Sequence, residues 1–175
     1  MKLTKRLLAM ALAGVMLLTI LTGCGGGKTG DRLVEEYMDA YYHSLDAYKD
    51  VPITNDVPEI KTVAEKFDPS LLDGTGIGFD ASVIYGSTLP ESLLQLKSAL
   101  ANYKSCTHVY LYAMAVPEGM SELTQVTLLL HNSGPYPAYT NTVRDIDSIK
   151  CASTLVKKDG KQYRLVVFIQ VPTAS

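Results

Sequence analysis

The chain has 175 residues, of which 47% are hydrophobic and 19% are charged, and this composition is typical of a globular protein rather than a disordered one. Three of its 16 lysines and arginines lie within the first six residues, so residues 24–175 contain 13 basic against 18 acidic residues, a net charge of −5. No basic stripe is left to neutralise phosphates. We therefore expect no nucleic acid among the partners of this protein.

The first 23 residues have the layout of a secretion signal. Lys2, Lys5 and Arg6 form a basic start, and an apolar run follows from Leu7 to Leu21. A membrane-spanning helix needs about 20 apolar residues, and the glycines from position 23 onward end this run before that length. The pattern therefore predicts a cleaved signal peptide over residues 1–23.

The signal ends with Leu21, Thr22, Gly23 and Cys24. This quartet resembles the lipobox of bacterial lipoproteins, in which a large aliphatic residue and two small residues precede a cysteine that is lipidated and becomes the N-terminus. The resemblance implies a diacylglyceryl group on Cys24, and two acyl chains suffice for stable anchoring. It further implies a domain held on the extracytoplasmic face of the cell membrane. The alternative is an ordinary signal peptide that ends in a cysteine by chance.

A glycine-rich stretch over residues 24–30 predicts a flexible tether, and residues 31–175 have a length that suits a single domain. Apolar residues at helical spacing predict helices over about 31–48, 57–67 and 89–103. Period-2 alternation predicts strands over about 79–85, 106–116, 122–132, 147–157 and 161–171. Asp159 and Gly160 predict a tight hairpin between the last two strands. We expect an α+β fold, with two or three N-terminal helices packed on one face of a curved antiparallel sheet of four to five strands.

This order of elements is similar to the nuclear transport factor 2-like, or cystatin-like, fold. The resemblance rests on element order and covers most of the chain after the tether. It implies a pocket between the concave sheet and the helices, which members of that family use either to bind small molecules or for catalysis. The enzymes among them place an Asp and His pair in the pocket, and we find no aspartate that pairs convincingly with any of the three histidines of this chain.

Hydrogen-bonding aromatic residues are the candidate pocket lining. They comprise His108, Tyr110 and Tyr112 on one face of a predicted strand, Tyr37 and Tyr41 on the first helix, and His131 beside a loop rich in proline and glycine. Side chains with an apolar body and a polar tip suit a ligand cavity, and they equally suit a half-solvated sheet surface. The three histidines lack the close spacing of zinc ligands, so we expect neither a metal nor a cofactor.

Two cysteines remain besides Cys24, and disulfides can form outside the cytosol. Cys106 and Cys151 fall on predicted strands that are not adjacent, too far apart for the Cα spacing of about 5.5 Å that a disulfide needs. We expect two free thiols, with a disulfide as the alternative.

No serine lies in a nucleophile elbow, and no order of Ser, His and Asp predicts a triad. We therefore expect a non-enzymatic binding or interaction domain. Its partners would be the membrane, through the lipid anchor, and an unidentified small molecule or envelope protein. Two alternatives stay open: a pocket enzyme, hydrolase or isomerase, with His108 as general base, and an accessory subunit of an envelope complex.

Overall fold

The computed structural model describes residues 30–46, 48–72, 76–80, 91–106, 108–132 and 146–173. The predicted signal peptide, Cys24 and the tether up to residue 29 lie outside these ranges. The described helices are α2 (Gly30–His43), α3 (Ile60–Lys66), α4 (Glu91–Ala99) and α5 (Glu122–Asn132). The described strands are β1 (Ile53–Thr54), β2 (Gly76–Asp80), β3 (His108–Val116), β4 (Ile146–Lys158) and β5 (Lys161–Pro172).

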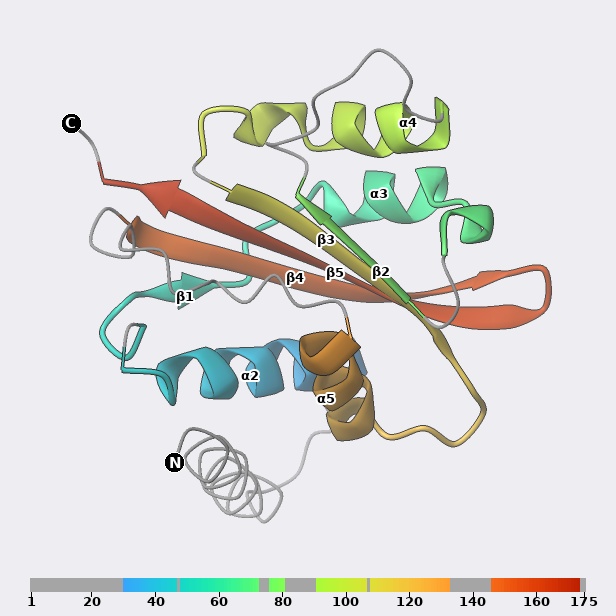
Figure 1. Ribbon diagram of the computed structural model, residues 1–175, viewed down its shortest axis with the longest axis horizontal. Helices are drawn as coiled ribbons and strands as arrows, with labels where there is room; N and C mark the ends of the chain where they lie inside the picture. The colour runs from blue at the N-terminus through green and yellow to red at the C-terminus, as the bar shows by residue number, and fades with distance from the viewer. Residues whose placement is uncertain are drawn as a thin grey trace.

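The strands form one five-stranded sheet in the order β1-β4-β5-β3-β2, which is seen edge-on and twisted in Figure 1. The α+β class is therefore confirmed. The sheet is mixed rather than purely antiparallel, because the short strand β1 pairs with β4 in parallel. All other neighbouring strands are antiparallel, and the long strands β4 and β5 form its centre together with β3.

The hairpin between β4 and β5 forms where the sequence predicts it. Asp159 and Gly160 have φ angles of 50° and 76°, and the pairing of Lys158 with Lys161 closes the turn around them. A two-residue turn with both φ angles positive matches the right-handed twist of the strands that it joins. Asparagine, aspartate and glycine tolerate this conformation best, so the dipeptide fixes the hairpin locally.

Helices cover both faces of the sheet, whereas the sequence predicted that they collect on one. In Figure 1, α3 and α4 lie above the sheet, and α2 and α5 lie below it. β5 is consequently buried on both sides from Tyr163 to Gln170. Its odd-numbered residues, such as Leu165 and Val167, join the core under α3 and α4, and Val166 and Phe168 join the core under α2. The sheet thus separates two hydrophobic cores.

The prediction of a strand at 122–132 is wrong, because these residues form α5. The helix begins after Ser121, whose Oγ accepts a hydrogen bond from the backbone N–H of Thr124 at 3.3 Å, as an N-cap does. Its buried residues Val126 and Leu129 lie three positions apart on one side, which is a helical and not a strand spacing. The helices are therefore not all N-terminal, since α5 lies between β3 and β4.

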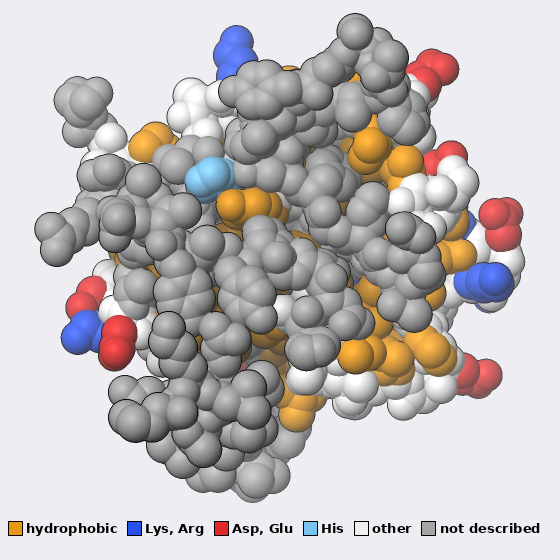
Figure 2. Space-filling model, in the orientation of Figure 1, with side chains coloured by type: hydrophobic (Ala, Val, Ile, Leu, Met, Phe, Trp, Pro, Cys, Tyr) orange, Lys and Arg blue, Asp and Glu red, His pale blue; other side chains and the backbone are white. Residues whose placement is uncertain are grey.

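The first helix is shorter than its apolar pattern predicts. α2 ends at His43, and Tyr48 is buried in the segment that follows it. The helix buries Val34, Met38 and Tyr42, spaced four residues apart, against the sheet. No helix among the described residues is long and apolar enough to cross a membrane. Figure 2 shows one face of the molecule, on which acidic and basic side chains lie around the edge and hydrophobic ones reach the surface between them.

Candidate functional site

A buried arginine lies at the meeting point of three elements. Arg164 of β5 is only 1% exposed, and it lines a cavity of about 300 Å³ between β5 and the first turns of α2 and α5. The other residues lining this Arg164 cavity are Gly30, Asp31, Val116, Pro117, Gly119, Met120, Glu122, Gln125, Leu155 and Gln162. In the alternation along β5, Arg164 falls on the same face as Gln162 and Gln170, and α2 and α5 turn that face into an interior.

Two side chains satisfy part of the guanidinium of Arg164. Its Nη1 forms an ion pair with Oδ1 of Asp31, and its Nε donates to Oε1 of Gln125 at 2.8 Å. Gln125 is itself buried, and its Nε2 donates to the backbone oxygen of Met120 at 3.1 Å. A buried charge is tolerated when it is paired and hydrogen-bonded, so this network explains how β5 accommodates an arginine.

The same network holds α2 against the exposed edge of β4. The Oγ of Ser153 donates to the backbone oxygen of Asp31 at 2.8 Å, and the backbone N–H of Ser153 donates to Oε1 of Glu35 at 2.9 Å. β1 pairs with β4 only at Ile149 and Lys150, so a side chain of α2 replaces the missing strand partner at Ser153. Burial raises the pKa of Glu35, and the hydrogen bond from Ser153 opposes that shift.

One side of the cavity brings opposite charges close together without pairing them. A Cβ placed on Gly30 would lie 2.8 Å from Oε1 of Glu122 and 3.6 Å from Nη2 of Arg164. These two atoms are therefore at most 6.4 Å apart, the sum of the two distances. Within the described part of the chain, no ion pair joins Glu122 to Arg164, and Nη2 of Arg164 donates to no protein atom.

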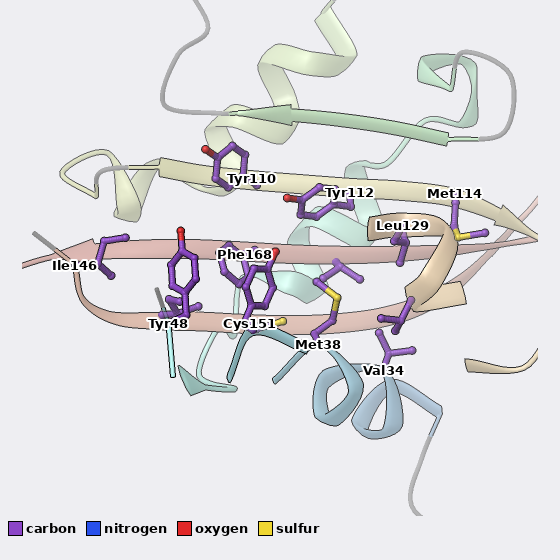
Figure 3. Close-up of a cluster of buried hydrophobic side chains, with 14 of the residues drawn as sticks. Val34, Met38, Tyr48, Tyr110, Tyr112, Met114, Leu129, Ile146, Cys151 and Phe168 are labelled. Carbon is purple, nitrogen blue, oxygen red and sulfur yellow. The ribbon is translucent and has the colours of Figure 1, made fainter. Parts of the chain in front are cut away.

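The predicted aromatic residues come together elsewhere, in the core between α2 and the sheet. The rings of His108 and Tyr110 stack at 5.4 Å, and those of Tyr110 and Tyr112 at 6.3 Å. Tyr37 and Tyr41 are partly buried against the same core. Figure 3 shows Tyr110 and Tyr112 of β3 on the same side of the sheet as Phe168 of β5 and Met38 of α2. His131 belongs to α5 rather than to a strand, and its side chain lies outside the described part.

Tyr110 and Tyr112 therefore belong to a hydrophobic core, Tyr37 and Tyr41 pack against it, and none of these four tyrosines is among the described residues that line the Arg164 cavity. The alternative of a half-solvated surface does not hold for Tyr110 and Tyr112, which are 9% and 3% exposed, whereas His108 is partly exposed. The tyrosine that the helical pattern overlooked, Tyr42, is 1% exposed and stacks on Phe168 with ring centroids 4.4 Å apart.

Tyr42 is the buried residue with an unsatisfied polar group. Its hydroxyl has no hydrogen-bond partner among the described residues, and burial raises its pKa well above the usual range. We expect Tyr42→Phe to raise the free energy of unfolding by about 1 kcal/mol, because a buried donor without a partner is destabilising. Tyr48→Phe is the matched control, since the hydroxyl of Tyr48 hydrogen-bonds to Gln170. It should lower that free energy by about 1 kcal/mol in urea unfolding, and equal effects of both substitutions would contradict the difference.

A second cavity of about 380 Å³ lies on the opposite side of the sheet. Its lining is mainly apolar and comes from α4, the 3₁₀ turn Ala101–Tyr103 and β3, with Leu94, Leu100, Tyr103 and Val109 as its large side chains. Leu94 is 49% exposed there. Among the described residues that line this cavity, Lys97 and Lys104 are the only charged ones, so this part of its lining offers less polar recognition than the Arg164 cavity.

The two cysteines of the domain lie on opposite sides of the sheet. Cys151 is buried in the core under α2, and Cys106 packs against the core under α3 and α4. Both are free thiols, and a bond between them would have to pass through the sheet. The described residues contain no group of three or more His, Cys, Asp or Glu side chains placed to hold a metal ion.

The sequence patterns did not predict the residues that form the most polar interior site, namely Arg164, Gln125 and Glu122. One indication of this site lies in β5, where an arginine stands within a run of eight buried residues. Comparison of the chain with family models, with curated proteins and with solved structures gave no match. The resemblance to nuclear transport factor 2-like proteins therefore stays a prediction.

Proposed function

We propose that this chain is a bacterial lipoprotein, held by a lipid on Cys24 at the extracytoplasmic face of the cell membrane, and that its domain binds a ligand rather than catalysing a reaction. The observation that carries the proposal is the quartet Leu21, Thr22, Gly23 and Cys24 at the end of a short apolar run. Such a run is typical of a secretion signal, and the quartet matches the lipobox pattern.

The position of the cavity supports a role near the membrane. Gly30 begins α2 and lines the Arg164 cavity, and it lies six positions after Cys24. Even a fully extended chain of that length spans only about 20 Å. A lipid on Cys24 would therefore keep the Arg164 cavity within about 20 Å of the point where the acyl chains enter the bilayer.

The chemistry of the cavity supports binding. A guanidinium with two of its nitrogens fixed by Asp31 and Gln125 cannot turn away, so its third nitrogen is pre-oriented toward the cavity. Preorganised donors at the floor of a concave site are typical of small-molecule sites. The donors already described are sufficient for binding, and binding requires no catalytic group.

Metabolic labelling with radioactive palmitate tests the anchor. We expect the wild-type chain to incorporate label and Cys24→Ala to incorporate none, because Cys24 would be the only acylated residue of this chain. Cys106→Ala is the matched control, since it removes a thiol of the domain and should leave labelling unchanged. Equal labelling of Cys24→Ala and wild type would refute the anchor.

A further inference from the structure

The Arg164 cavity presents one guanidinium and two carboxylates, of which Asp31 already pairs with Nη1 of Arg164, whereas Glu122 has no ion pair among the described residues. Nη2 of Arg164 is a donor without a protein partner among the described residues, and the Glu122 carboxylate lies at most 6.4 Å from it across Gly30. A cation alone would leave Nη2 of Arg164 without an acceptor, and an anion alone would leave the Glu122 carboxylate without a partner. A ligand with both charges satisfies both groups.

A helix end strengthens the anionic half of this site. α2 has 14 residues and α5 has 11, and both begin at the cavity, at Gly30 and Glu122. The N-terminus of each helix carries about half a positive charge, and at α5 the N-cap Ser121 and the carboxylate of Glu122 already meet it. Together with a guanidinium that is 1% exposed, the end of α2 at Gly30 favours a phosphate over a weaker acceptor.

The size of the cavity limits the ligand. Its volume of about 300 Å³ equals that of about ten water molecules in the liquid. This space is large enough for a small polar molecule. We propose that the Arg164 cavity binds a small zwitterion with a primary ammonium and a phosphate, with the ammonium at Glu122 and the phosphate at Arg164.

Phosphoethanolamine is the simplest molecule of this class, and a membrane offers it as a lipid headgroup. The headgroup source rests on the proposed lipid anchor, which would hold the cavity near the bilayer. The chemical class does not depend on the anchor, because it follows from the charges around Gly30. A failure to bind O-phosphoethanolamine would therefore contradict the ligand class alone, and a failure to incorporate palmitate would contradict the lipid anchor alone.

Calorimetric titration of the full chain in a non-ionic detergent tests the ligand class. The probe is O-phosphoethanolamine, and inorganic phosphate and ethanolamine each carry one of its two charges. We expect O-phosphoethanolamine to bind at least about tenfold more tightly than either single-charge compound, because only it meets both groups. No heat with O-phosphoethanolamine, or equal affinity for inorganic phosphate, would overturn the proposal.

A pair of variants tests the position of the ammonium. Glu122→Gln removes the carboxylate charge and should weaken O-phosphoethanolamine binding about tenfold while leaving phosphate binding unchanged or tighter. Glu118→Gln makes the same charge change at an exposed position that does not line the cavity, and it should have no effect. Thermal unfolding of both variants controls for folding. Equal affinities of Glu122→Gln and Glu118→Gln would overturn the assignment.

Vesicles added to the titration identify the source. If the ligand is a lipid headgroup, vesicles containing phosphatidylethanolamine should compete with O-phosphoethanolamine, and vesicles of phosphatidylglycerol alone should not. If neither competes while the free compound binds, the ligand is a soluble zwitterion. Either result supports the ligand class, and equal competition by both kinds of vesicle would contradict it.

Discussion

Arg164→Ala is expected to lower the free energy of unfolding by about 3 kcal/mol. Breaking a buried ion pair by removing one partner usually costs about 3–5 kcal/mol, because the other partner is left uncompensated. We expect the lower end of that range, since the Asp31 side chain is 40% exposed and can regain water. The loss of the hydrogen bond to the buried Gln125 adds to the effect. Urea unfolding followed by circular dichroism measures it.

Two further variants make the Arg164 prediction specific. Arg32→Ala removes a cation from the first turn of α2, where Arg32 pairs with Glu36 at 3.3 Å but is 65% exposed, so it should cost less than about 1 kcal/mol. Asp31→Asn leaves the Arg164 charge buried without its anion, and it tests the pair if Arg164→Ala does not fold. A destabilisation by Arg164→Ala no larger than that by Arg32→Ala would show that the network contributes little.

Phe168→Ala should lower the free energy of unfolding by about 3–5 kcal/mol. Phe168 is fully buried at the centre of β5, and its ring stacks on Tyr42 at 4.4 Å and lies 6.5 Å from the ring of Tyr110. Its removal leaves a cavity that joins α2, β3 and β5, and rigid neighbours on both faces of the sheet prevent collapse. The same urea experiment applies.

Leu123→Ala is the control for Phe168→Ala. Leu123 is 41% exposed on α5 and lines neither cavity, so its truncation should change the free energy of unfolding by less than about 0.5 kcal/mol. If the two substitutions were equally mild, the core between α2 and the sheet would be loosely packed and the described contacts would not determine stability.

The sequence predicted those elements whose structure depends on residues close together in the chain. The Asp159–Gly160 turn, the second helix and strands β3, β4 and β5 follow from turn chemistry and periodicity within short windows. The prediction of a strand over 122–132 was wrong because the leucines of this segment fit a buried strand as well as a helix. Its N-cap at Ser121 was the signal that separates the two readings.

The site could not be predicted because its partners are distant in sequence. Asp31 and Gln125 lie 133 and 39 positions from Arg164, and each belongs to a different helix. Arg164 alternates with the apolar residues of β5 on the face that also carries Gln162 and Gln170, and such a face is usually solvated. Only the placement of α2 and α5 on that face makes it an interior. The tyrosines that were expected to line a pocket instead pack in or against the core, because most of each side chain is apolar.

Mass spectrometry of the N-terminal peptide from membrane-purified protein tests whether the chain is cleaved between Gly23 and Cys24 and lipidated on Cys24. We predict a peptide that begins at Cys24 and bears a diacylglyceryl thioether. A peptide that begins at Met1, or a Cys24 with an unmodified thiol, would contradict the proposed anchor.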